Sequence, residues 1–266
     1  MKLAGKVIVV TGGGNGIGRE VVLELLRRDA RVAAVDIRRD SLDETAELAG
    51  AGDRLATFVV DITDRAATVD LPGRVIEKFG AVDGVLNVAG IIQPFVKLAD
   101  LDYDAIERVV DVNLYGTIHV VKAFLPYLLQ RPEAHIGNVS SMGGFLPVPG
   151  QTVYGATKAA VKLLTEGLYA ELLETDVAVS VILSGAVATE ITSNSGVAVP
   201  VSDPDQASRF PTTSAADAAT IILDGIENDA FHIYVGRDSR LMGILSRLAP
   251  KRATHLIQRR MRKLLG

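Results

Sequence analysis

The stretch VIVVTGGGNGIGREVVLELL, from Val7 to Leu26, indicates the fold of this chain. A run of apolar, β-branched residues comes first, then a loop rich in glycine, then a segment with helical spacing of its apolar residues. Glycines let the backbone turn tightly and approach a phosphate, and the helix that follows offers free N–H groups and the positive end of its dipole. A plain tight turn would also use glycine. The strand before the loop and the helix after it favour a dinucleotide-binding loop.

The rest of the chain repeats this alternation of short apolar runs with helical patterns. Several runs are apolar throughout, which is typical of strands that are buried on both faces. The pattern predicts an α/β protein whose single domain is built on a doubly wound (Rossmann) parallel sheet of about seven strands. We expect these strands at Lys6–Val10, Arg31–Asp36, Arg54–Asp61, Val82–Asn87, His135–Ser140, Val177–Leu183 and Phe231–Val235.

The second expected strand ends at Asp36, eighteen residues after Gly18. A carboxylate at this position can bond both ribose hydroxyls of NAD and would repel the 2′-phosphate of NADP. Arg38 and Arg39 follow closely, and either could fold back toward such a phosphate or simply begin a solvated helix. The balance favours NAD as the cofactor.

The composition narrows the class of protein further. The 266 residues are 48% hydrophobic, which is enough for one large core. The chain has no cysteine and its four histidines lack metal-ligand spacing, so we expect no metal site. The net charge of −4 gives no sign of nucleic-acid binding. The apolar runs are too short for a signal peptide or a membrane span, so we expect a soluble, cytoplasmic protein.

A second informative stretch is TVYGATKAAVKLL, from Thr152 to Leu164, in which Tyr154 and Lys158 interrupt an apolar helical pattern. Residues four positions apart lie on the same face of a helix. Such a pair can simply cover apolar surface with its polar tips. The chemical interpretation is a proton-transfer site, because a nearby ammonium stabilises a phenolate and lowers a tyrosine pKa from about 10 by roughly 1–3 units.

Together these stretches resemble the short-chain dehydrogenase/reductase family. TGGGNGIG matches its T-G-x-x-x-G-x-G loop, NVAG (Asn87 to Gly90) its motif after the fourth strand, and YGATK its Y-x-x-x-K pair. VNLYG supplies Asn113 and NVSS supplies Ser141. The motifs occur in order over roughly residues 5–235. The resemblance implies a Rossmann fold, NAD or NADP, and the interconversion of an alcohol and a carbonyl.

The resemblance also assigns roles to single residues. Tyr154 would be the proton-transfer residue, and Lys158 would tune it and bond the nicotinamide ribose. Ser141 would hold the substrate oxygen, because its spacing from Tyr154 fits the family better than that of its neighbour Ser140. Asn113 would hold a water that links Lys158 to solvent, although an asparagine in an apolar helical stripe can equally bond local backbone.

The expected cofactor site combines the phosphate loop with residues at the ends of later strands. We expect the cofactor to contact Gly12, Asn15, Gly16, Ile17, Gly18, Asp36, Asp61, Ile62, Asn87, Ala89, Gly90, Tyr154, Lys158 and Thr189. The chain departs from the family where Ser184 replaces the usual proline before Gly185. We expect a less rigid backbone before Gly185, and therefore a less precisely defined position for the nicotinamide ring.

Weakly polar segments are expected to line the substrate pocket. They include Ile91–Val96, Met142–Val148 and a lid over residues 190–213. They predict an apolar secondary alcohol or ketone of steroid or lipid size, turned over by a homodimer or homotetramer. The alternative function is a non-catalytic NAD-binding or membrane-associated interaction protein on the same fold.

The C-terminal region, residues 237–266, differs electrically from residues 1–236, which we expect to form the catalytic domain. It holds nine Lys or Arg and one Asp, whereas the rest of the chain holds 19 basic and 31 acidic residues. Two apolar helical stripes flank Pro250. We expect a basic amphipathic extension that either contacts an anionic membrane surface or packs on the protein body or a neighbouring subunit.

Overall fold

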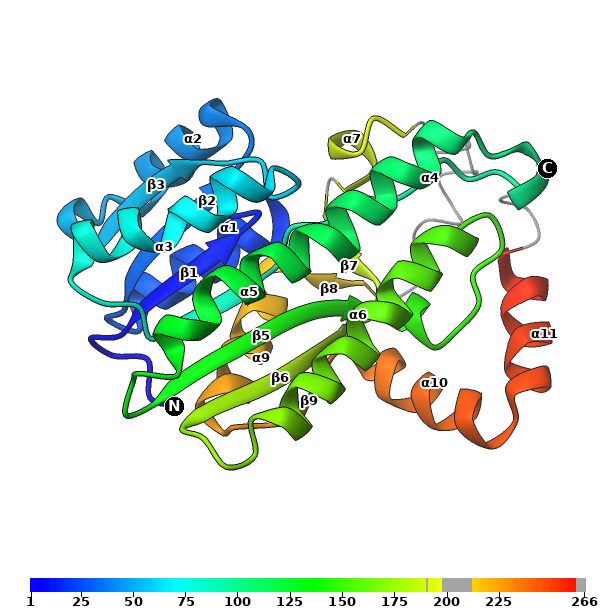
Figure 1. The fold of residues 1–266 in the computed structure, drawn as a ribbon. Coiled ribbons are helices and arrows are strands. Elements are labelled where there is room, and N and C mark those ends of the chain that lie inside the picture. Colours follow the sequence, from blue (N-terminus) through cyan, green and yellow to red (C-terminus); the bar gives the residue numbers. More distant parts are fainter. Residues whose placement is uncertain (190, 198–211, 262–266) are drawn as a thin grey trace.

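The computed structural model describes residues 1–189, 191–197 and 212–261. Within them, parallel strands form a seven-stranded sheet in the order β3-β2-β1-β4-β5-β6-β9 (Figure 1). The strands are β1 (Val7–Thr11), β2 (Arg31–Asp36), β3 (Leu55–Val59), β4 (Gly84–Asn87), β5 (Ala134–Ser141), β6 (Val177–Ser184) and β9 (His232–Val235). The predicted doubly wound sheet is confirmed, and no strand end departs from its expected place by more than two residues.

Helices cover both faces of this sheet (Figure 1). One layer contains α1 (Gly16–Arg27), α2 (Arg39–Ala49) and α9 (Ala215–Glu227), and the other contains α3 (Arg65–Phe79), α5 (Thr117–Leu128) and α6 (Thr152–Glu171). Along β1, Ile8 and Val10 belong to the core on the first side, while Val7 and Val9 belong to the core on the second. This burial on both faces explains why the sequence of β1 is almost entirely apolar.

Further elements lie near the carboxyl ends of the strands. The helix α4 (Tyr103–Val110) continues through a π-helical turn, Asp111–Gly116, into α5. The short strands β7 (Val187–Ala188) and β8 (Thr213–Ser214) pair with each other, and α7 (Ile191–Asn194) follows β7. Most of the expected lid lies outside the described residues.

The strand order reverses beside β1, and this reversal places the ligand site. The chain builds outward from β1 to β3 and then returns to β4 on the other side of β1. Open α/β sheets bind ligands at the carboxyl ends of the strands at such a point. Here the Thr11 hydroxyl accepts hydrogen bonds from the N–H groups of Val88 (3.1 Å) and Ala89 (3.2 Å). These bonds hold the segment after β4 against the end of β1.

The C-terminal region folds into α10 (Arg237–Leu248) and α11 (Pro250–Met261), which lie at the edge of the molecule (Figure 1). Pro250 begins α11, a position where the missing N–H costs nothing. Met242, Ala253 and Ile257 are buried together with Leu146 of the loop after β5. The described part of the tail therefore packs on the protein body, one of the two expected alternatives.

The charged residues of the tail lie apart from this apolar contact. Lys251, Arg252 and Arg259 are exposed on α11. No helix in the described ranges has the length and apolar character to cross a membrane. Contact with a membrane surface stays a prediction, as does the homo-oligomeric state.

Candidate active site

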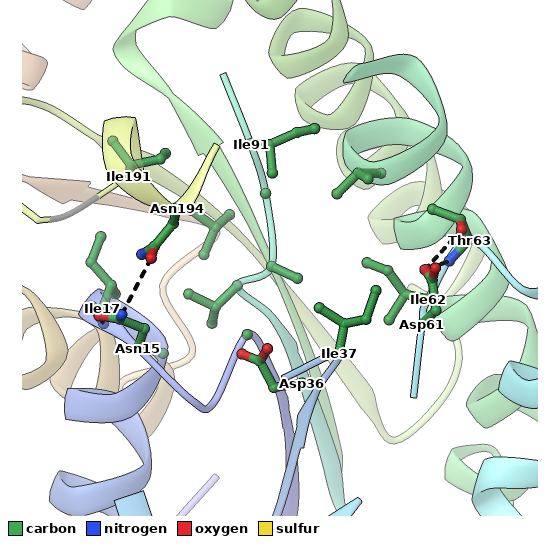
Figure 2. A pocket seen from close by; sticks show the side chains of 18 of the residues that line it. Asn15, Ile17, Asp36, Ile37, Asp61, Ile62, Thr63, Ile91, Ile191 and Asn194 are labelled. Carbon is green, nitrogen blue, oxygen red and sulfur yellow. Dashed lines mark hydrogen bonds between the residues drawn. The ribbon is translucent and has the colours of Figure 1, made fainter. Parts of the chain in front are cut away.

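A groove of about 680 Å³ opens where the strand order reverses (Figure 2). The expected cofactor residues that line it are Gly12, Asn15, Gly16, Ile17, Gly18, Asp36, Asp61, Ile62, Ala89, Gly90, Tyr154, Lys158 and Thr189. Asn87 lies beneath this groove instead of in its wall. Its side chain is 3% exposed and donates to Asn138 Oδ1 at 2.8 Å, so it joins β4 to β5.

The glycine loop brings the backbone close to the groove because side chains would not fit. Gly12 has φ +71°, and a Cβ there would lie 2.9 Å from the Ala89 backbone. A Cβ on Gly18 would lie 2.0 Å from the Gly12 carbonyl oxygen. Asn15 caps α1 by accepting from Gly16 N–H at 2.6 Å, and the first turn of α1 carries no acidic side chain. The positive helix end is therefore suited to a phosphate.

The Asp36 carboxylate is held in the groove by the same loop. Its Oδ2 accepts from Gly14 N–H at 3.0 Å, and its Oδ1 accepts from Arg38 N–H at 3.1 Å. The Arg38 guanidinium donates to Asn194 Oδ1 on α7 at 3.0 Å. Figure 2 shows Asn194 bonded to the Asn15 side chain as well, at 3.4 Å. Arg38 thus lies at the groove but is directed to the α7 segment.

Asp61 and Ile62 form the far end of the groove (Figure 2). Asp61 Oδ1 accepts from the N–H of Thr63 at 2.9 Å and from its hydroxyl at 2.7 Å, which fixes the turn after β3. The side chain of Ile62 packs where Gly116 leaves room, since a Cβ there would lie 2.7 Å from Ile62. The result is an apolar wall of the kind that can face a flat ring.

Tyr154 lies in the first turn of α6, beside the end of β5. Burial raises the pKa of the Tyr154 phenol, and a hydrogen bond with the Ser141 hydroxyl opposes this increase. The same Ser141 oxygen accepts from Gly143 N–H at 3.1 Å. Ser140 is fully buried and donates to the Lys158 carbonyl oxygen at 2.7 Å, so its hydroxyl serves packing. Of the two serines, Ser141 is the one that meets Tyr154.

Lys158 is 5% exposed, one helical turn after Tyr154. Its Nζ donates to the Val139 carbonyl oxygen at 2.9 Å, and burial lowers the pKa of Lys158 to about 8. The sequence led us to expect that Lys158 lowers the pKa of Tyr154. The structure differs, because burial raises the pKa of the Tyr154 phenol and the opposing contribution comes from the hydrogen bond with Ser141.

Asn113 is buried in the π-helical turn between α4 and α5. Its Oδ1 accepts from Ile91 N–H at 2.9 Å, and its Nδ2 donates to the Ile91 carbonyl at 2.9 Å and to Thr157 Oγ1 at 3.1 Å. The side chain therefore bonds the backbone of a segment 22 residues away and a hydroxyl of α6, and these are not the local backbone bonds of the alternative interpretation. It holds the Ile91 segment against α6, while its role in holding water stays a prediction.

The end of β6 shows how the replacement of proline is accommodated. Ser184 is the last residue of β6, aligned with Ser141 of β5 and Val235 of β9. Its hydroxyl donates to the Ser140 carbonyl oxygen at 3.2 Å. Hydrogen bonds thus hold the backbone where a less rigid one was expected. Thr189 follows and lines the groove, with its methyl group 3.5 Å from the position that a Cβ on Gly16 would take.

One buried polar residue that bonds the backbone of Tyr154 was not predicted from the sequence. Gln93 is fully buried and bonds the start of α6 through its side chain. In the sequence, Gln93 is a single amide within the weakly polar segment Ile91–Val96. That segment was predicted to line the substrate pocket, so no capping role was assigned to Gln93.

The fold, glycine loop and groove define a Rossmann-type dinucleotide-binding protein. Residues 6–198 match the family described as short chain dehydrogenase. A Mycobacterium tuberculosis protein named as the oxidoreductase SadH is 34% identical over 254 residues, which cover 92% of this chain and 91% of that protein. The chain therefore belongs to the short-chain dehydrogenase/reductase family, and it is an oxidoreductase of that family.

Two solved structures of the family are similar over nearly their whole length. A Burkholderia phymatum short-chain dehydrogenase/reductase in complex with NAD has a TM-score of 0.82 and 27% identity, covering 93% of this chain and 96% of its own. A Burkholderia cenocepacia short-chain dehydrogenase in complex with NADP has a TM-score of 0.81 and 25% identity, covering 97% and 99%. Two solved structures that are about equally similar to this chain thus bind different cofactors.

Proposed function

We propose that the protein is an NAD-dependent oxidoreductase that interconverts a secondary alcohol and a ketone, with Tyr154 as the proton-transfer residue. The observation that carries this proposal is the Tyr154 phenol at the edge of the groove, hydrogen-bonded to Ser141 and one helical turn from Lys158. A bound nicotinamide supplies or accepts hydride. The glycine loop, the Asp36 carboxylate and the positive end of α1 fit a dinucleotide.

The chain's own residues move and hold the proton. Ser141 binds the substrate oxygen, and Tyr154 removes its proton during oxidation or returns it during reduction. Burial raises the pKa of the Tyr154 phenol and so favours its protonated form. The Lys158 ammonium would favour the phenolate, and the positive charge of an oxidised nicotinamide bound beside it would lower the pKa of Tyr154 further.

We expect NAD to bind more tightly than NADP. The Asp36 carboxylate is fixed at the groove by Gly14 and can accept from ribose hydroxyls, whereas a 2′-phosphate would meet its negative charge. Titration of both cofactors measures the preference, and Asp36→Ala should reduce it. Equal or stronger binding of NADP would contradict the assignment and implicate Arg38, which Arg38→Ala would then test.

The loop after β5 supports an apolar substrate. Met142 and Phe145 are partly buried beside Ser141, and they continue into the apolar cluster that includes Leu146 and Ile257. Leu146 is 1% exposed, so it packs on the tail and does not line a pocket. Part of the expected pocket wall is therefore core, and the tail supports the remainder from behind.

A substrate screen tests the proposed function. Apolar secondary alcohols of increasing size are offered with NAD, and formation of NADH is followed. We expect turnover to rise from small polar alcohols to large apolar ones, and the reverse reaction to consume NADH with the matching ketones. Tight NAD binding without turnover in either direction would favour the non-catalytic alternative.

A further inference from the structure

The helix α6 that carries Tyr154 begins without a cap from its own sequence. Gln151 occupies the capping position but makes no side-chain capping bond, and the first turn has no acidic residue. The first N–H groups of any helix lack partners within the helix and must find them elsewhere. At α6 the partner comes from a segment about sixty residues earlier in the chain, where Gln93 Oε1 accepts from the N–H groups of Val153 (2.8 Å) and Tyr154 (2.9 Å).

Further bonds fix the orientation of the Gln93 amide. Its Nε2 donates to the Gly150 carbonyl oxygen at 3.0 Å, so the oxygen must face the helix. Gln151 Nε2 donates to the Gln93 carbonyl oxygen at 2.8 Å and holds its backbone as well. Gln93 is fully buried, which shields these bonds from water. The side chain is thus a rigid connection between the segment after β4 and the start of α6.

The same segment is tied to the rest of the site. Ile91 is bonded at both its N–H and its carbonyl by Asn113. Ile92 N–H donates to Ser195 Oγ at 3.0 Å, and Ser195 follows α7. Gly90, the preceding residue, lies against Lys158, since a Cβ there would be 3.1 Å from Nζ. The segment 90–93 therefore fixes the groove wall, the α7 segment and the backbone of Tyr154 relative to one another.

We propose that Gln93 is a positioning residue, a cap from outside α6 that sets the place of the Tyr154 phenol relative to the groove. The inference rests on the proposed function of Tyr154. Two of the three side-chain bonds of Gln93 end on Tyr154 and on the residue before it. Without them the first turn of α6 loses its partners, and the phenol leaves its place beside Ser141. A displacement near 1 Å can lower turnover by about 100-fold.

The test compares variants of the full-length protein that keep or remove the accepting oxygen. Gln93→Met, of similar length but without hydrogen bonds, should lower kcat by about 10–100-fold while the Kd for NAD changes little. Gln93→Glu retains an acceptor for both N–H groups and should recover much of kcat. Its added negative charge should move the acidic limb of the pH–rate profile for alcohol oxidation to higher pH, because it disfavours the phenolate that accepts the proton. Gln151→Met, in the same buried network, should lower kcat less than Gln93→Met, because the Gln151 side chain bonds only the Gln93 carbonyl oxygen and its loss leaves both accepting contacts of Gln93 in place.

A double variant separates positioning from general damage. If Gln93 acts through Tyr154, then Gln93→Met should lower kcat no further in a Tyr154→Phe background. Equal losses of kcat in both backgrounds, or normal kcat in folded Gln93→Met, would overturn the inference. An equal loss in Gln151→Met would overturn it as well. If Tyr154→Phe itself retains normal turnover, the proposed function fails first, and the two failures are thereby distinguished.

Discussion

Replacing Tyr154 with phenylalanine should leave NAD binding intact and lower turnover by on the order of 10²–10⁴-fold, the usual contribution of a proton-transfer residue. Phenylalanine keeps the ring in place and removes only the hydroxyl, which bonds Ser141. The glycine loop and Asp36, where we expect the cofactor to bind, lie on other elements of the groove. Steady-state turnover with the best alcohol, together with titration of NAD, gives both quantities.

Tyr169→Phe is the matched control for this substitution. Tyr169 lies on the same helix, but its ring packs on Phe231, with centroids 4.3 Å apart, and it does not line the groove. The same chemical change there should leave turnover near normal. Near-normal turnover of Tyr154→Phe would show that another group transfers the proton, and a parallel loss of NAD binding would point to a structural role for the phenol.

Local sequence patterns predicted the fold because its elements are defined by short-range periodicity. Several strands of the sheet are apolar runs, and β1 is buried on both faces. The ends of the strands could therefore be predicted to within two residues. The glycine loop was equally readable, since Gly12 and Gly18 lie where no Cβ fits. Asp36 could be assigned to the groove because it is the last residue of the predicted strand that became β2.

The contacts that sequence analysis missed join residues far apart in the chain. Gln93 meets Val153 and Tyr154 only once the segment after β4 lies beside α6, and no local pattern encodes that approach. The pKa of Tyr154 is another example. The spacing of Tyr154 and Lys158 indicated their proximity, but the balance between burial and charge depends on the tertiary structure around both groups.

Lys158→Met should make the protein more stable while it weakens NAD binding and turnover. Burial lowers the pKa of Lys158 from 10.5 to about 8, so below pH 8 the folded protein holds an ammonium that the unfolded chain would solvate better. That destabilisation is fully present below pH 8 and fades as the pH rises through 10.5, above which lysine is neutral in both states. Methionine removes the charge, so the free energy of unfolding at pH 7 should rise by about 1–3 kcal/mol, after allowance for the lost bond to Val139.

Urea unfolding of the cofactor-free proteins at pH 7 and pH 10 measures this effect, and the gain from Lys158→Met should shrink at the higher pH. Lys162→Met is the control on the same helix, because Lys162 pairs with Glu166 at 2.6 Å and its replacement should give no gain. A less stable Lys158→Met at pH 7, or a gain that is the same at both pH values, would contradict the argument.

Saturating NAD should stabilise the native protein more than the variant, since a ligand stabilises the state that binds it. The buried ammonium would then be a group that destabilises the empty fold and is retained because the bound cofactor and the Tyr154 phenolate interact with it.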